Sequence, residues 1–223
     1  MSIEAFNIPS NLARTEEPVD IPTNGTKLLD WLTGEIKSTL SGVLKDTFKT
    51  VADGDISMEP LHGYCSFSQA IGAYTLLDKG LNPNPFSLQS LDENHVGHAV
   101  LTIELPKDGR SHLYLVDPTF RQFCDPDIPE HDGIPMPGYY LAETETGQEI
   151  IEGLLRNGYI EINAEKANEY IASFCEGNSP FATSEEAFNF MRNPPYDGCY
   201  ENFAKNIMEE KGYLIPSAPI PAL

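Results

Sequence analysis

Three residues of the types used in nucleophilic catalysis follow one another along the chain, at Cys65, His98 and Asp117. A cysteine nucleophile needs a general base, usually a histidine, and a third group that fixes the tautomer of the imidazole ring. Free cysteine is also among the most buried residue types, so Cys65 alone would be assigned to the core. A catalytic role therefore requires that the fold bring the three side chains together.

Cys65 lies at the start of a predicted amphipathic helix that ends at Gly80. Its apolar residues recur at helical spacing, at Phe67, Ile71, Tyr74 and Leu77. Free backbone N–H groups and the dipole at a helix N-terminus stabilise a thiolate and lower the pKa of a cysteine there. The same N–H groups can contribute to an oxyanion hole. This position favours a reactive thiol.

The stretch HAVLTIELPKDGRSHLYLVDPTF, residues 98–120, predicts a β-hairpin with strands over residues 100–105 and 112–116. Asp108 and Gly109 form the strongest type of two-residue hairpin turn signal. With these two residues in the loop, Lys107 pairs with Arg110, and this pairing fixes the register of the whole hairpin.

In this register Val100 lies opposite Asp117, and His98 lies opposite Thr119. His98 shares a face with Val100 because strand side chains alternate, so His98 and Asp117 become diagonal neighbours on one face. A slip of one residue would place them on opposite faces. The expected proximity of His98 and Asp117 therefore depends on the Asp-Gly turn.

The order of predicted elements, helices followed by strands followed by helices, indicates an α+β fold. A helix is predicted within residues 26–48, where leucines recur at helical spacing. We divide the chain into a flexible N-terminal arm (1–25), a core (26–124), a Pro-rich loop (125–140), a helical C-terminal extension of the same domain (141–214) and a flexible tail (215–223).

Capping signals mark helices in the extension. A capping box is predicted at Thr146 and Glu149, before a helix that stops at Gly158. Further helix starts are predicted at Asn163 and at Thr183, and a last helix at residues 198–212.

The stretches GYCSFSQAIGAYTLLDKG, HAVLTIEL and HLYLVDPTF resemble the transglutaminase-like branch of the papain-like cysteine enzyme superfamily. The matching motifs are Gly63-Tyr64-Cys65 at a helix start, His98-Ala99 opening a strand and Asp117-Pro118-Thr119 ending the next. The gaps of 33 and 19 residues between Cys65, His98 and Asp117 are of the family's usual order. The resemblance covers about residues 60–123 and implies a Cys-bearing helix packed on an antiparallel sheet.

The resemblance also implies a reaction, in which Cys65 attacks a carboxamide or peptide carbonyl while His98 acts as base and then acid. Asp117 would orient His98. The thioester would pass to a small amine or to water, giving a transglutaminase or a glutamine deamidase that acts on a protein substrate without a cofactor or metal. The alternatives are a cysteine protease of the same fold and a catalytically silent, acidic protein-binding domain.

The sequence departs from the family pattern in two places. No aromatic residue follows His98-Ala99, and no glutamine lies a few residues before Cys65 to donate to an oxyanion. Some transglutaminases use an upstream tryptophan instead, but Trp31 lies in an apolar helical setting that favours a core position. The second oxyanion donor is therefore not identified.

The remaining chemistry-bearing residues are assigned to structural roles. His95 with His98 and Asp117 would form a metal site only if residues three apart on a strand shared a face, which they do not. Gln69 and Ser66 can contact substrate but are more simply polar residues of the first helical turns. Structural positions are also predicted for the other histidines and cysteines, namely His62, His112, Cys124, Cys175 and Cys199.

The composition excludes several classes of partner. The net charge is −20, with 34 acidic and 14 basic residues, which disfavours binding to nucleic acid or to an anionic membrane surface. No run of about 20 apolar residues is present, and the N-terminal residues lack the pattern of a secretory signal peptide. A cytoplasmic protein with free thiols is expected, with export by a signal-peptide-independent system left open.

Overall fold

The computed structural model describes residues 27–34, 65–78, 81–88, 97–125, 129–131 and 134–194. These residues form an α+β fold, as the sequence predicts. The predicted N-terminal arm, the C-terminal tail, the helix at residues 198–212 and the part of the first helix beyond residue 34 lie outside the described residues.

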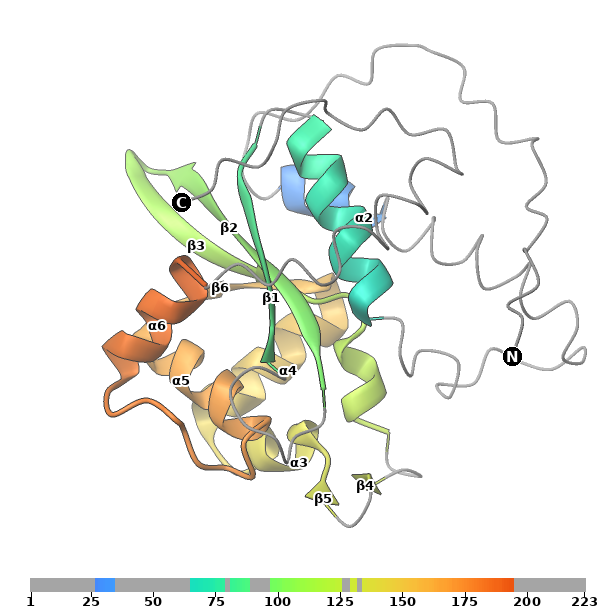
Figure 1. The fold of residues 1–223 in the computed structure, drawn as a ribbon, viewed down its shortest axis with the longest axis vertical. Helices are drawn as coiled ribbons and strands as arrows, with labels where there is room; N and C mark the ends of the chain where they lie inside the picture. The colour runs from blue at the N-terminus through green and yellow to red at the C-terminus, as the bar shows by residue number, and fades with distance from the viewer. Residues whose placement is uncertain are drawn as a thin grey trace, which may run out of the picture.

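A four-stranded antiparallel sheet forms the centre of the fold, in the order β1-β2-β3-β6 (Figure 1). Its strands are β1 (Pro83–Ser87), β2 (Ala99–Lys107), β3 (Arg110–Val116) and β6 (Tyr159–Ile162). The helices are α2 (Cys65–Asp78), α3 (Pro137–Ala142), α4 (Glu145–Asn157), α5 (Ala164–Ser173) and α6 (Ser184–Arg192), besides the helical residues 27–34. A 3-10 turn, η3 (Phe120–Phe123), follows β3, and β4 (Glu130–His131) pairs with β5 (Ile134–Pro135).

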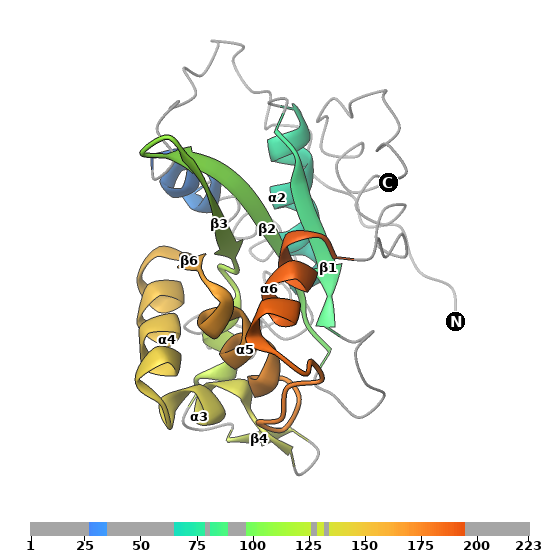
Figure 2. The same ribbon diagram turned by 90° about the vertical axis from the view of Figure 1, so that its left-hand side faces the viewer.

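Helices cover both faces of the sheet (Figures 1 and 2). On one face, α2 and residues 27–34 pack against the odd-numbered residues of β2, such as Leu101 and Ile103. On the other face, α3 to α6 pack against Val100 of β2 and against Leu113 and Leu115 of β3. Because strand side chains alternate, each strand of the hairpin supplies apolar residues to two separate cores.

The predicted hairpin register is confirmed. Lys107 pairs with Arg110, and the ladder continues without a slip to the pair formed by Leu101 and Val116. The turn residues have positive φ values, 51° at Asp108 and 75° at Gly109, which a tight two-residue turn requires.

Two strands of the sheet were not expected from the sequence. β1 contains Pro83 and Pro85, which argue against a strand inside a sheet, but it occupies an edge, where proline is tolerated. β6 has only four residues and lies within the segment predicted to be a helical extension. That extension therefore also contributes to the sheet, and the predicted order of helices, strands and helices is too simple.

The predicted Pro-rich loop also contains regular structure. The β4–β5 pair lies within it, and α3 begins inside its boundary at Pro137. Proline is well suited to the first helical position because no intrahelical hydrogen bond needs its N–H. Met136, which precedes the helix, is fully buried.

The predicted helix ends are mostly confirmed. Gly158 ends α4 with a φ of 80°, and the side chains of Asn163 and Thr183 accept backbone N–H bonds at the starts of α5 and α6. The predicted cap at Thr146 is wrong. Thr144, whose backbone is extended, caps α4 by accepting from the N–H of Gly147 at 2.9 Å.

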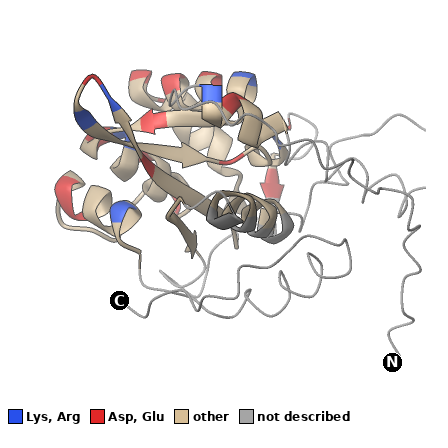
Figure 3. Ribbon diagram, turned by 90° about the horizontal axis from the view of Figure 1, so that it is seen from above, with Lys and Arg blue, Asp and Glu red and all other residues tan. Residues whose placement is uncertain are grey.

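Acidic side chains predominate over basic ones on the described helices (Figure 3). The exposed ones are Asp30 of residues 27–34, Glu145, Glu149 and Glu152 of α4, Glu165 of α5, and Glu185 and Glu186 of α6. Among the described residues, no helix is long and apolar enough to cross a membrane.

Candidate active site

Cys65, His98 and Asp117, together the candidate triad, each lie at the end of an element. Cys65 is the first residue of α2, His98 directly precedes β2, and Asp117 directly follows β3. Because β2 and β3 are antiparallel, the start of one and the end of the other meet at the same end of the sheet. All three residues are buried, with exposed fractions of 7%, 1% and 2%.

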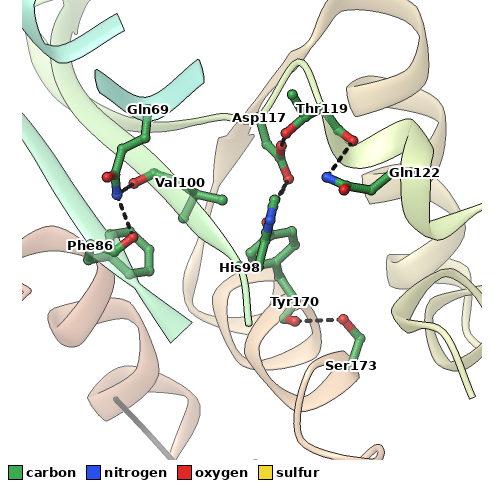
Figure 4. Close-up of polar contacts among 9 residues, drawn as sticks. All are labelled: Gln69, Phe86, His98, Val100, Asp117, Thr119, Gln122, Tyr170 and Ser173. Atoms are coloured by element: carbon green, nitrogen blue, oxygen red, sulfur yellow. Dashed lines mark hydrogen bonds and ion pairs between the residues drawn. The ribbon is translucent and has the colours of Figure 1, made fainter. Parts of the chain in front are cut away.

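The imidazole ring of His98 is held by its Nε2 atom, which lies 2.7 Å from Oδ2 of Asp117 (Figure 4). The predicted contact between these two residues is confirmed. Two aromatic rings fix the plane of the imidazole: Phe174 stacks on it at a centroid distance of 5.0 Å, and Phe123 meets it edge-on at 4.6 Å. The other ring nitrogen, Nδ1, is buried and has no hydrogen-bond partner of regular geometry. It is therefore the nitrogen open to proton exchange.

Cys65 and His98 change each other's proton affinity. Burial alone would raise the pKa of Cys65, but hydrogen bonding and charge interaction with His98, with a backbone hydrogen bond at Ala99, lower it below its ordinary value. Burial alone would lower the pKa of His98, but the charge and hydrogen bond of Asp117 and the interaction with Cys65 raise it to about 9. Both shifts are in the direction of a thiolate beside an imidazolium.

Asp117 accepts three side-chain hydrogen bonds. Besides the bond from His98, Oδ2 accepts from the hydroxyl of Tyr170 at 2.8 Å, and Oδ1 accepts from the hydroxyl of Thr119 at 3.0 Å. Its backbone N–H donates to the carbonyl of Gly158 at 2.9 Å. A buried carboxylate needs such donors to remain ionised.

Sequence reasoning missed the contribution of α5 to this site. Tyr170 lies in α5, and Phe174 follows its last residue. Both lie on the apolar side of the helix, four residues apart, so helical spacing alone indicates that they face the core. Nothing in the spacing indicates that this part of the core surrounds His98, because the contact depends on how α5 packs on the sheet.

Gln69 has a structural role: its hydrogen bonds connect α2, the helix that begins with Cys65, to the sheet. It lies one turn after Cys65, and its Nε2 donates to the carbonyls of Phe86 and Val100, both at 2.7 Å (Figure 4). These two residues are opposite each other on β1 and β2. One amide group therefore joins α2 to both strands.

Replacement of Gln69 by leucine is expected to lower the free energy of unfolding by about 1–3 kcal/mol, because two buried hydrogen bonds are lost. Chemical denaturation measures the change. The matched control is Gln148→Leu, which removes a single exposed bond to the carbonyl of Ala142. Equal stability of the two variants would contradict the role assigned to Gln69.

The structure separates most of the other candidate residues from the triad. Trp31 packs against the core on the α2 face of the sheet, as predicted. His112 pairs with Glu161 at 2.7 Å across β3 and β6. Cys175 packs within the core on the α3–α6 face. Cys124 packs against the same core but lies near Asp117; burial and then the charge of Asp117 raise the pKa of Cys124 to about 11. His62, His95, Cys199 and the side chain of Ser66 lie outside the described residues.

No group of three or more His, Cys, Asp or Glu side chains suited to a metal ion occurs within the part of the chain that the structure describes. The candidate triad itself presents a buried cysteine that interacts with a histidine. The imidazole is oriented by a carboxylate, and its free nitrogen is available for proton transfer.

The Cys65–His98 pair also predicts a pattern of stability against pH. In the unfolded chain His98 titrates near 6.5 and Cys65 near 9.0, so between these pH values one proton is bound, on the thiol. In the folded chain His98 keeps its proton up to its raised pKa of about 9, and the lowered pKa of Cys65 brings the loss of the thiol proton to a lower pH. Once Cys65 has ionised, the folded chain holds one proton as the unfolded chain does, so from that pH up to 9 the pair adds no pH dependence to the stability of the native protein.

The Cys65→Ala variant is expected to behave differently in this range. His98 is then the only member of the pair, and the charge and hydrogen bond of Asp117 still raise its pKa, although the contribution of Cys65 is gone. The stability that this raised pKa contributes is fully present below pH 6.5. It is lost as the pH rises through the folded-state pKa, by up to about 1.4 kcal/mol for each pH unit. Urea unfolding of both proteins at pH 6, 7.5 and 9 gives the comparison. Parallel curves would show that Cys65 and His98 titrate independently.

The chain matches no protein-family model, and neither a curated protein nor a solved structure matches it significantly.

Proposed function

We propose that this protein is a cysteine-dependent acyltransferase or amidohydrolase that acts on protein carboxamides, with a papain-like core of the transglutaminase-like branch. The observation that carries the proposal is the environment of His98: its Nε2 contacts Asp117, its Nδ1 has no regular hydrogen-bond partner, and its pKa is raised in part by interaction with Cys65. A histidine used only for packing would not need a carboxylate on one side and a thiol of lowered pKa on the other.

The order and packing of the secondary-structure elements support the proposal. A helix that begins with the candidate nucleophile packs on an antiparallel sheet. After β1, the hairpin of β2 and β3 supplies the histidine at its start and the aspartate at its end. This is the order implied by the motifs Gly63-Tyr64-Cys65, His98-Ala99 and Asp117-Pro118-Thr119. Cys65 also lies at the N-terminal end of its helix, where free backbone N–H groups stabilise the negative charge of a thiolate.

In the proposed reaction the thiolate of Cys65 attacks the carbonyl carbon of a glutamine side chain, forming a C–S bond and a tetrahedral oxyanion. The imidazolium of His98 gives its Nδ1 proton to the departing nitrogen, the C–N bond breaks, and ammonia leaves a thioester on Cys65. An amine or water then attacks the thioester while Nδ1 takes up its proton, and the thiolate is released. Asp117 remains a carboxylate throughout.

The experiment that tests the proposal is intact-mass analysis of unfolded, glutamine-containing proteins incubated with the enzyme and a small primary amine. Addition of the amine identifies transamidation, the small mass gain of deamidation identifies hydrolysis, and fragments identify the protease alternative. The control is Cys65→Ala. A modification that persists in this variant would contradict the proposed nucleophile, and a native Cys65 that alkylates no faster than an ordinary thiol would favour a silent binding domain.

A further inference from the structure

Tyr170 contacts the candidate triad from a helix that the proposed mechanism does not use. Its side chain is fully buried, and its hydroxyl donates to Oδ2 of Asp117 at 2.8 Å. The same oxygen accepts from His98 Nε2 at 2.7 Å. We infer that Tyr170 is a positioning residue, whose hydroxyl shares the charge of Asp117 with His98 and so sets how tightly His98 holds its proton.

The groups around this carboxylate come from several elements. His98 precedes the first strand of the hairpin and Thr119 follows the second, so both flank the carboxylate at the open end of the hairpin. Cys65 belongs to α2, and Cys124 follows η3. Within the described part of the chain, Tyr170 is the only side chain of the α3–α6 layer that donates a hydrogen bond to this carboxylate. Burial, and then the nearby charge of Asp117, raise the pKa of Tyr170 well above its ordinary value, so its hydroxyl remains a donor over the whole working range.

The hydroxyl matters because of a conflict in the role of His98. Asp117 must orient the ring, but a carboxylate that holds the imidazolium too strongly would keep the proton that must pass to the leaving nitrogen. A second donor on Oδ2 takes up part of the carboxylate charge. Without that donor, the carboxylate depends more on the imidazolium, most of all in a buried site. Removal of the hydroxyl should therefore make His98 harder to deprotonate.

A purely structural role for Tyr170 can be separated from this one. The ring packs against Phe120 and Phe174, at centroid distances of 6.0 and 5.2 Å. Tyr170→Phe keeps these ring contacts and removes only the hydroxyl. The matched control is Tyr159→Phe, because the hydroxyl of Tyr159 also donates to a carboxylate, Oδ1 of Asp30, at 2.7 Å, but away from the triad.

The inference rests on the proposed function for its catalytic meaning, but its test needs no substrate. Histidine-labelled protein is titrated by NMR, and the signal missing from His98→Ala is assigned to His98. We expect the pKa of His98 to rise by about 0.5 to 1 in Tyr170→Phe and to stay unchanged in Tyr159→Phe. Thr119→Val, which removes the donor on Oδ1, is expected to shift it in the same direction.

The outcomes distinguish this inference from the proposed function. If the pKa of His98 is high in the native protein but unchanged in Tyr170→Phe, the role of Tyr170 is overturned and the proposed function stands. If the pKa of His98 in the native protein lies at or below its ordinary value, the thiolate–imidazolium pair required by the proposed function is overturned. If Tyr170→Phe does not fold, Thr119→Val alone decides the inference.

Discussion

Replacement of His98 by alanine is expected to slow the alkylation of Cys65 by iodoacetamide at pH 6 by about 10²–10³-fold. In the native protein, interaction with His98 lowers the pKa of Cys65 despite the opposing effect of burial. Without the imidazolium, burial dominates, and the thiol is almost wholly protonated at this pH. The rate is measured by intact mass as one carbamidomethyl group is added.

Three other cysteines set the background of this measurement. Cys65→Ala reports their combined rate, which should be slow at pH 6; burial raises the pKa of Cys124 to about 11. The dependence on pH gives a second check, because native Cys65 should remain reactive well below the pKa of an ordinary thiol. Equal alkylation rates for the native protein and His98→Ala would contradict the activation of Cys65 by His98.

Asp117→Asn is expected to lower the free energy of unfolding at pH 7 by about 3–5 kcal/mol, because it leaves a buried imidazolium without its counter-charge. An amide also fits poorly among the donors of His98, Tyr170 and Thr119, since its NH₂ group would face another donor. Urea unfolding monitored by circular dichroism measures the loss.

The matched control is Asp30→Asn. Asp30, like Asp117, accepts a hydrogen bond from a tyrosine hydroxyl. Unlike Asp117, Asp30 is exposed, and no histidine contacts it in the described structure. A loss of less than about 1 kcal/mol is expected there. A similar small loss for Asp117→Asn would show that His98 is neutral in the folded protein, and would remove the electrostatic basis for the proposed chemistry.

The sequence was most informative where the structure is local. Asp108 and Gly109 specify a tight turn through their own backbone preferences, so the register of β2 and β3 follows from two residues. The contact between His98 and Asp117 is a direct consequence of that register. Gly158, Asn163 and Thr183 were identified for the same reason, since a cap acts on its immediate neighbours.

The features that the sequence did not indicate depend on contacts between distant segments. β1 is a strand because β2 offers it an edge, although Pro83 and Pro85 have a low preference for strands. Tyr170 reaches Asp117 across 53 positions of the chain, and Gln69 reaches Val100 across 31. Local preference and spacing carry no information about such pairs. The missed cap at Thr144 is a smaller error, because Thr146 offered an equally good local signal two residues later.

The two prolines of β1 have a consequence for the way an extended peptide can approach the molecule. Leu88 donates its N–H to His98, so the even-numbered positions of this segment direct their N–H groups toward β2. The N–H positions of Pro83 and Pro85 therefore face the outer edge, where proline provides no donor. A peptide that added itself to the sheet at this edge would meet carbonyl groups at both residues without the donors that normally alternate with them. If the proposed function holds, a protein substrate is therefore expected to be recognised by some means other than extending the sheet at β1.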